Sequence, residues 1–338
     1  MILIHELGHY IAARMMDVKV NEFALGMGPK LLKFQKGETL FCLRAVPIGG
    51  FCAMEGEETT SGDSRAYYAK RPWRRAVICA AGATLNILLG FVLCLILTVQ
   101  QPAYASTTVG AFYENEGGEH VSSQESGLQV GDKIISVNGN SVINANDVEF
   151  SILRDKNPDV GVDIVVKRGG EKVPLTIKFE CVEEQGHKIF IRDFYYSRIE
   201  KSFTSVVSQS FLKGVSFVKL VWFTLVDIVT GQVSANEMSG PVGVTTAISD
   251  AVSQGENFLE KLNSVLYMVT LITINLGVFN LLPLPALDGG KLIFLLLEAI
   301  RRKPIKPEYE GYVHFAGMAL LILLMIFVTF NDIVRLFT

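Results

Sequence analysis

The sequence predicts a polytopic α-helical membrane protein of about four transmembrane helices, with a membrane-associated β-hairpin region and an inserted α+β domain. Charged residues make up only 19% of the 338 residues, and the mean hydropathy is positive at +0.34. Several apolar runs approach or reach the roughly 20 residues that a helix needs to cross a bilayer. The net charge of −3 and the lack of a basic arm argue against nucleic acid as a partner.

The first apolar segment, residues 1–16, carries the motif His5-Glu6-Leu7-Gly8-His9. Residues at i and i+4 of a helix share one face, so both imidazoles can bind a single Zn²⁺. Glu6 then stays free to accept a proton from water at the metal. Ionisable residues at membrane depth are costly and are functional by default, which favours a metal site over a chance match of surface histidines.

This first segment is shorter than a spanning helix requires. Either the helix dips partway into the membrane, or the protein has further apolar residues upstream of Met1. We favour the second interpretation on length alone, and we expect the native N-terminus to lie before Met1.

The region from Asp17 to about Glu58 predicts short strands and glycine turns. Residues 34–44 predict two strands around a turn at Gly37. A hairpin beside the motif helix can offer an open edge to an extended peptide. A plain connecting hairpin is an equally good interpretation.

The clearest transmembrane helix is the uncharged run of residues 76–99. A basic cluster precedes it and predicts that this end faces the cytoplasm; its members are Arg65, Lys70, Arg71, Arg74 and Arg75. The small residues at 80–83 favour close helix packing. Asn86 inside the run either contacts a neighbouring helix or faces the metal site.

Residues 107–183 are soluble in character and should lie outside the membrane, because they follow a helix entered from the cytoplasm. Asn138-Gly139 and Gly169-Gly170 each follow an alternating run and predict hairpin turns. The segment resembles a PDZ domain of the bacterial protease type, a class that captures extended peptides by strand addition. A domain that only fills space is the alternative.

The domain division follows these changes in character: residues 1–106, 107–183, 184–260 and 261–338. Within the third part, residues 203–229 are apolar but interrupted by Gln209, Lys213 and Lys219. This pattern predicts an amphipathic helix on or in the outer leaflet more than a span.

Two further spans are expected at residues 265–282 and 315–330, with a basic cytoplasmic segment, 301–306, between them. The first of these spans ends in residues 280–290, where two prolines break the helix and free backbone groups at membrane depth. Asp288 is the only carboxylate in this apolar stretch. By itself, Asp288 before Gly289 would be interpreted as a turn residue. Two His and one carboxylate with one open position make the ligand set of a catalytic zinc, so together with the first helix we expect Asp288 to be the third ligand.

The remaining cysteines and histidines show no ligand spacing. Cysteine occurs without any Cys-x-x-Cys pair, which argues against a disulfide framework or a cysteine zinc site; the positions are Cys42, Cys52, Cys79, Cys94 and Cys181. His120, His187 and His314 have no partner pattern and are interpreted as surface or interface residues.

Together these motifs resemble the bacterial site-2 protease family of intramembrane zinc metalloproteases, of the RseP type with one PDZ domain. The resemblance rests on His5–His9, on Gly82-Ala83-Thr84-Leu85-Asn86, on the PDZ-like segment and on residues 280–290. It implies zinc bound by His5, His9 and Asp288, with Glu6 as the catalytic residue. It also implies that Asn86 and Asn280 contact substrate and that residues 29–50 guide it. The family has Pro where Ala83 stands, and more apolar residues before the motif.

The resemblance implies an enzyme of the inner, cytoplasmic membrane of a bacterium, acting in regulated intramembrane proteolysis. Its expected partners are the lipid bilayer and single-pass transmembrane substrates such as anti-sigma factors or remnant signal peptides. A membrane scaffold that binds peptides beside an inactive metal site is one alternative, against which the intact Glu6 argues. A zinc transporter is another, against which the PDZ-like segment argues.

Overall fold

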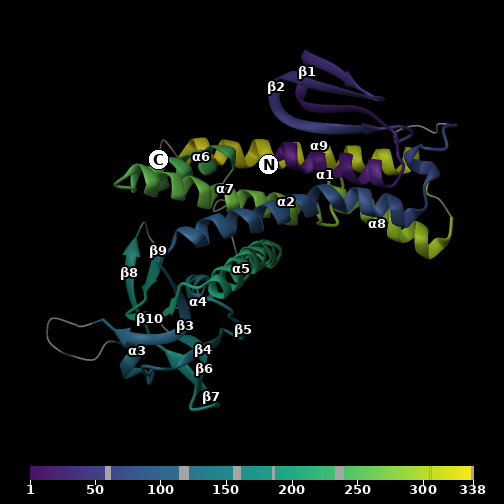
Figure 1. Cartoon of the computed structure of the whole chain (residues 1–338). Helices are drawn as coiled ribbons and strands as arrows, with labels where there is room; N and C mark the ends of the chain where they lie inside the picture. Colours follow the sequence, from purple (N-terminus) through teal and green to yellow (C-terminus); the bar gives the residue numbers. More distant parts are fainter. Residues whose placement is uncertain are drawn as a thin grey trace. The chain divides into compact units, whose positions relative to one another are not determined.

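The computed structural model describes residues 1–57, 62–113, 122–154, 161–184, 187–232, 240–303, 305 and 307–335. The chain forms two compact units (Figure 1). The membrane unit consists of residues 1–93 and 224–338, and the inserted unit of residues 94–223. The predicted division at residues 106, 183 and 260 stays a prediction.

Apolar runs of the sequence form the helices of the membrane unit. These are α1 (Ile2–Met15), α2 (Pro72–Gln100), α6 (Pro241–Ser253), α7 (Phe258–Asn280), α8 (Asp288–Arg301) and α9 (Pro307–Arg335), with a 3-10 turn at Tyr67–Ala69. Among the described residues, three stretches are long and apolar enough to cross a membrane: Pro72–Gln100, Phe258–Asn280 and Glu308–Val334. They match the predicted runs at 76–99, 265–282 and 315–330. α1 has 14 residues and is not among them, so a fourth span there stays a prediction.

Small residues bring α1, α2 and α7 into close contact. A Cβ on Gly8 of α1 would lie 2.8 Å from the Cα of Gly82 in α2. A Cβ on Gly277 of α7 would lie 2.9 Å from the carbonyl oxygen of Ala83. The helix backbones therefore touch where side chains are missing, as the small residues at 80–83 predict.

The β-region is one curled antiparallel hairpin of β1 (Val20–Lys36) and β2 (Thr39–Met54), which contacts α1 (Figure 1). The predicted turn forms at Gly37, whose φ of +62° suits glycine. Both strands are longer than predicted. Because the hairpin curls, residues 20–25 pair with residues 40–43 on one side and with 50–54 on the other. Residues 50–54 thus form an edge of this sheet, and no other described strand pairs with it.

The inserted unit contains a sheet of strand order β10-β3-β4-β6-β7, with β5 paired to β4. Its elements up to β7 are β3 (Ala103–Phe112), α3 (Ser122–Glu125), β4 (Lys133–Val137), β5 (Asn140–Ser141), α4 (Ala145–Leu153), β6 (Val162–Arg168) and β7 (Glu171–Ile177). The pair β8 (Glu180–Glu184) and β9 (His187–Ile191), the strand β10 (Phe194–Glu200) and the helix α5 (Phe203–Val229) follow. Both predicted hairpin turns are confirmed, at Asn138-Gly139 and Gly169-Gly170, where all four φ angles are positive. The PDZ identity of the unit stays a prediction.

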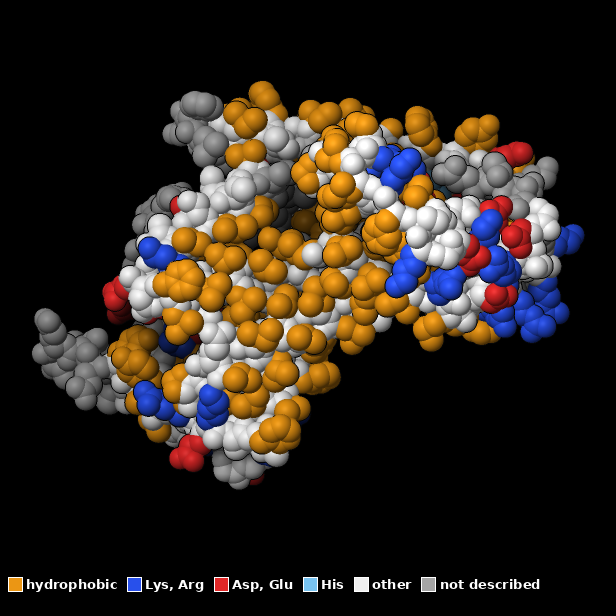
Figure 2. Space-filling view, turned by 45° about the horizontal axis from the view of Figure 1, so that its top comes forward, with side chains coloured by type: hydrophobic (Ala, Val, Ile, Leu, Met, Phe, Trp, Pro, Cys, Tyr) orange, Lys and Arg blue, Asp and Glu red, His pale blue; other side chains and the backbone are white. Residues whose placement is uncertain are grey.

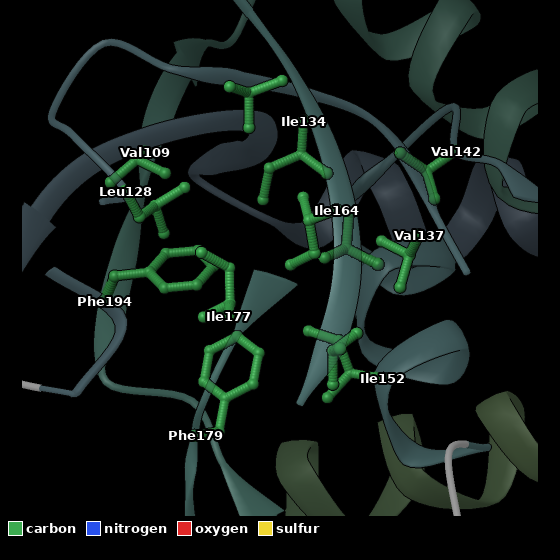
Figure 3. Packing of buried hydrophobic residues seen from close by; sticks show 13 residues of the cluster. Val109, Leu128, Ile134, Val137, Val142, Ile152, Ile164, Ile177, Phe179 and Phe194 are labelled. Carbon is green, nitrogen blue, oxygen red and sulfur yellow. The ribbon is translucent and has the colours of Figure 1, made fainter. Parts of the chain in front are cut away.

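One apolar core holds the sheet of the inserted unit against α4. Figure 3 shows its side chains converging from the strands and from α4, among them Ile134, Ile164, Ile177 and Phe194, which are fully buried. A buried polar contact joins α4 to the part of α5 that lies in this unit. Asp147 accepts hydrogen bonds from Ser216 and from Lys219, the latter at 2.5 Å. The predicted helix over residues 203–229 is present, and its place on the membrane stays a prediction.

Candidate metal centre

The structure brings the two histidines of the motif together. Both lie on α1, one turn apart, and their Nε2 atoms are 3.2 Å from each other. The two rings are nearly perpendicular, with an interplanar angle of 84°. This arrangement follows from helix geometry, because side chains at i and i+4 stand one above the other.

Asp288 meets both histidines from the other end of the chain. Its Oδ2 lies 3.3 Å from His5 Nε2 and 3.3 Å from His9 Nε2. It is the first residue of α8, directly after the break at the two prolines. Gly289 makes this turn possible, because a Cβ there would overlap the carbonyl oxygens of Leu281 and Leu282.

These three side chains fit a zinc ion. A tetrahedral zinc with bonds of about 2.0–2.1 Å separates its ligand atoms by about 3.3–3.4 Å, close to the spacing of the three atoms here. Asp288 Oδ2 is buried and accepts no hydrogen bond from the described residues, as expected of an atom that binds a metal. A set of three protein ligands leaves one position of a four-coordinate site for water or substrate.

α2 holds the histidine rings from the opposite side. His9 Nδ1 donates a hydrogen bond to the carbonyl oxygen of Ile78 at 2.9 Å, which leaves Nε2 free for a metal. Gly82 lies directly against both rings, since a Cβ there would overlap His9 Nε2 and approach His5 Cε1 to 2.9 Å. The sequence assigns Gly82 only to helix packing, and the structure shows that the site itself needs it.

A cavity of about 840 Å³ opens onto the three ligands. Glu6 lines it, as does the sheet edge at residues 50–54. The edge passes so close to Glu6 that a Cβ on Gly50 would lie 3.0 Å from Glu6 Cγ. The same cavity is thus lined by the candidate base, the candidate metal ligands and the edge of the β1–β2 hairpin.

The cavity also contains polar groups that no motif of the sequence indicates. Lys291 of α8 donates to Glu57 Oε1 at 2.6 Å, and Tyr68 donates to Glu310 Oε2 at 2.8 Å. Burial acts to lower the pKa of Lys291, but the charge of Glu57 outweighs it and raises that pKa above its usual value. Lys291 therefore stays a cation inside the cavity.

His314 is not the ordinary surface or interface residue that the sequence predicted. It lines the cavity, and its Nδ1 accepts a hydrogen bond from the backbone N–H of Ala286 at 2.9 Å. Ala286 has a φ of +72° and stands two residues before Asp288. The one signal for this role in the sequence is that His314 is an isolated histidine in an apolar helix. No motif spacing links it to its hydrogen-bond partner, the backbone N–H of Ala286.

The two asparagines of the resemblance, Asn86 and Asn280, differ in their distance from the candidate ligands. Asn86 is fully buried in α2, and its Nδ2 lies 3.5 Å from His5 Nδ1. Asn280 is the last residue of α7 and is partly exposed. Neither is among the described residues that line the cavity, so a substrate contact of either one stays a prediction.

Comparison with known proteins gives matches along the whole chain. The sequence profile of Peptidase family M50 matches residues 1–324. A protein of Clostridium acetobutylicum is 36% identical over 348 aligned residues, which cover 99% of this chain and 94% of the relative. The Regulator of sigma-W protease RasP of Bacillus subtilis is 29% identical, and the alignment covers 100% of this chain and 96% of the relative. The Zinc metalloprotease RasP of Shouchella clausii is 30% identical, with 100% of this chain and 97% of the relative covered. The resemblance to the site-2 protease family is confirmed, and the chain belongs to Peptidase family M50.

Proposed function

We propose that the chain is an intramembrane zinc metallopeptidase that hydrolyses peptide bonds within or near the transmembrane segments of single-pass membrane proteins. The observation that carries the proposal is the triangle of His5 Nε2, His9 Nε2 and Asp288 Oδ2, with Glu6 on the same cavity. The names of the relatives support a site-2-type zinc enzyme.

The chemistry divides between the metal and Glu6. A zinc ion in this site would supply Lewis acidity, which lowers the pKa of a water molecule and polarises the peptide carbonyl. His5 and His9 would hold it as neutral imidazoles and Asp288 as a carboxylate. Glu6, which lines the cavity but is not one of the three ligands, accepts the proton of the attacking water and returns it to the leaving amine.

The substrate must be unwound before it can react, because a transmembrane helix hides its carbonyls in its own hydrogen bonds. The edge at residues 50–54 lines the cavity and has no partner strand among the described residues on its outer side. An extended substrate can pair with this edge by strand addition, which satisfies the backbone groups that unwinding frees.

The membrane around the protein is proposed to be the bacterial cytoplasmic membrane. Large apolar side chains are exposed on α9 and on the hairpin, for example Leu320 at 68% and Leu32 at 66%. Figure 2 shows hydrophobic side chains over much of one face, with a dense group of charged side chains, many of them Lys and Arg, at one end. This separation suits a bilayer with its basic end in the cytoplasm. Substrates of the anti-sigma factor class agree with the name of the Bacillus subtilis relative, and remnant signal peptides are the second class.

Replacement of Glu6 by glutamine tests the proposed chemistry. An amide cannot accept the water's proton, so Glu6→Gln should keep stoichiometric zinc and cut a model transmembrane substrate roughly 10²–10⁴-fold more slowly than wild type. Glu310→Gln is the matched control, because it changes another cavity carboxylate but keeps the acceptor for Tyr68. Undiminished cleavage by Glu6→Gln would overturn the mechanism. Zinc uptake into vesicles without any cleavage would favour a transporter.

The inserted unit is proposed to select substrates, either by blocking bulky ectodomains or by capturing a new C-terminus through strand addition. Ala103 and Glu200 pair directly across β3 and β10, so a short Gly-Ser linker can replace residues 104–199. The shortened protein should cleave a trimmed substrate at a similar rate and begin to admit its untrimmed version. Unchanged discrimination would place the selection elsewhere, and loss of all cleavage with zinc still bound would make the unit part of the catalytic fold.

A further inference from the structure

We propose that Asn86 is a positioning residue of the metal centre, whose side-chain oxygen accepts a hydrogen bond from His5 Nδ1–H. The contact holds the His5 ring with Nε2 directed to the other two ligands. The inference rests on the zinc centre of the proposed function, and it replaces the substrate contact that the resemblance implied for this residue.

The location of Asn86 argues for this role. Its side chain is 0% exposed and is not among the described residues that line the cavity, whereas His5 is. Its side-chain amide lies 3.5 Å from His5 Nδ1, slightly farther than in an ordinary hydrogen bond. A residue placed in this way reaches the reaction through His5 and does not touch a substrate in the cavity.

The protons of the His5 ring decide the direction of the contact. A neutral imidazole that binds metal through Nε2 carries its proton on Nδ1, so Nδ1 must donate. As placed, the amide turns its own donor, Nδ2, toward Nδ1, while Asn86 Oδ1 accepts nothing from the described residues although it is buried. Amide oxygen and nitrogen are assigned from their hydrogen bonds, not from their positions. Rotation of the amide by half a turn gives both Nδ1–H and Oδ1 a partner.

The same face of α2 also holds the ring of His9 through its second nitrogen. Ile78, Gly82 and Asn86 stand at i, i+4 and i+8 and therefore face one direction. The Ile78 carbonyl accepts from His9 Nδ1 at 2.9 Å, and Gly82 lets both rings approach. Asn86, one turn further along α2, is in the position to accept a hydrogen bond from His5. Fixing a ring through its second nitrogen is how outer partners tune metal-binding histidines.

Zinc affinity of the full-length purified protein tests the inference without any activity assay. The probe is zinc alone, in competition with a chromophoric chelator. Asn86→Leu keeps the size but removes the acceptor, and should weaken zinc binding roughly 10–100-fold. Asn86→Asp keeps the acceptor and should bind zinc at least as tightly as wild type. Thr270→Val is the control, since Thr270 is equally buried in α7 and its hydroxyl donates to the Leu266 carbonyl of its own helix.

The outcomes separate the two roles of Asn86. Wild-type zinc affinity in Asn86→Leu combined with a raised KM for a model substrate would overturn the inference and restore the substrate contact. If Asn86→Leu does not fold, Asn86→Asp decides alone, because zinc affinity below that of wild type contradicts an acceptor role. Failure of the wild-type protein to bind zinc would instead overturn the proposed function.

Discussion

The two units of the protein use apolar side chains in different ways. In the inserted unit, the fully buried side chains include Phe194, Ile134 and Ile164. In the membrane unit, Asn86 and the threonines of α7 are fully buried, and large apolar side chains such as Leu320 and Leu323 are exposed. The first unit folds by removing apolar surface from water. The second also packs small and polar groups inside, beside its buried apolar side chains, because lipid covers the apolar outside and offers nothing to hydrogen-bond.

This difference changes what each unit can tolerate. An apolar core of many interdigitated side chains loses stability in proportion to what is removed. The metal centre instead depends on a few close approaches, such as that of Gly82 to the histidine rings, where one added carbon displaces a ligand atom. Substitutions in the apolar core should therefore lower the stability of the inserted unit, whereas substitutions at the metal centre should weaken zinc binding.

Removal of the third ligand should have the largest effect. Asp288→Ala leaves two protein ligands, so zinc affinity should fall by more than the roughly 10–100-fold that loss of an outer partner costs. Asp288→Asn should be nearly as damaging, because it removes the charge. Zinc content of the purified protein, measured by mass spectrometry, checks both variants. If both hold stoichiometric zinc as tightly as wild type, Asp288 is only a turn residue.

A single methyl group at Gly82 should come next. In Gly82→Ala the new Cβ overlaps His9 Nε2, so the ring or the helix must shift and chelator competition should show weaker zinc binding. Gly169→Ala in the inserted unit is the matched control. No atom lies within 4 Å of a Cβ there, but the φ of +59° costs about 1–2 kcal/mol locally. Equal zinc affinities in the two variants would contradict the tight fit of α2 against the rings.

A large cavity in the inserted unit should reduce stability and leave the metal centre unchanged. Ile164→Ala removes a fully buried core side chain and should destabilise the unit by about 2–5 kcal/mol. Hydrogen exchange of β4 and β6 in the full-length protein should become faster, while zinc affinity stays at the wild-type value. A parallel loss of zinc would show that the two units are energetically coupled.

The smallest effect is expected on the apolar surface of α9. Leu320→Ala shortens an exposed side chain that lipid surrounds in the folded protein and in the separated helix alike. Thermal stability in detergent and in lipid should change by less than about 0.5 kcal/mol. A clear loss of stability would mean that another protein surface, and not lipid, covers this position.

Local pattern was enough to predict much of this protein. Three apolar runs predict the three helices of spanning length, and the dipeptides at 138–139 and 169–170 predict the hairpin turns. The spacing of His5 and His9 also determines their geometry, because a helix repeats every 3.6 residues whatever surrounds it. The curl of the β1–β2 hairpin is not local: it depends on pairing of both halves of β2 with the start of β1.

Tertiary structure decided which residues meet around the metal. α2 is apolar on all sides apart from a few residues, so no periodicity indicates which face packs against α1. Only the close crossing at Gly8 and Gly82 turns Asn86 toward His5 and the Ile78 carbonyl toward His9. In the same way, only the packing of α9 brings His314 to the backbone of Ala286. Contacts between segments that are far apart in the sequence depend on how the helices pack. The sequence predicts that packing only where a known motif identifies the residues that meet.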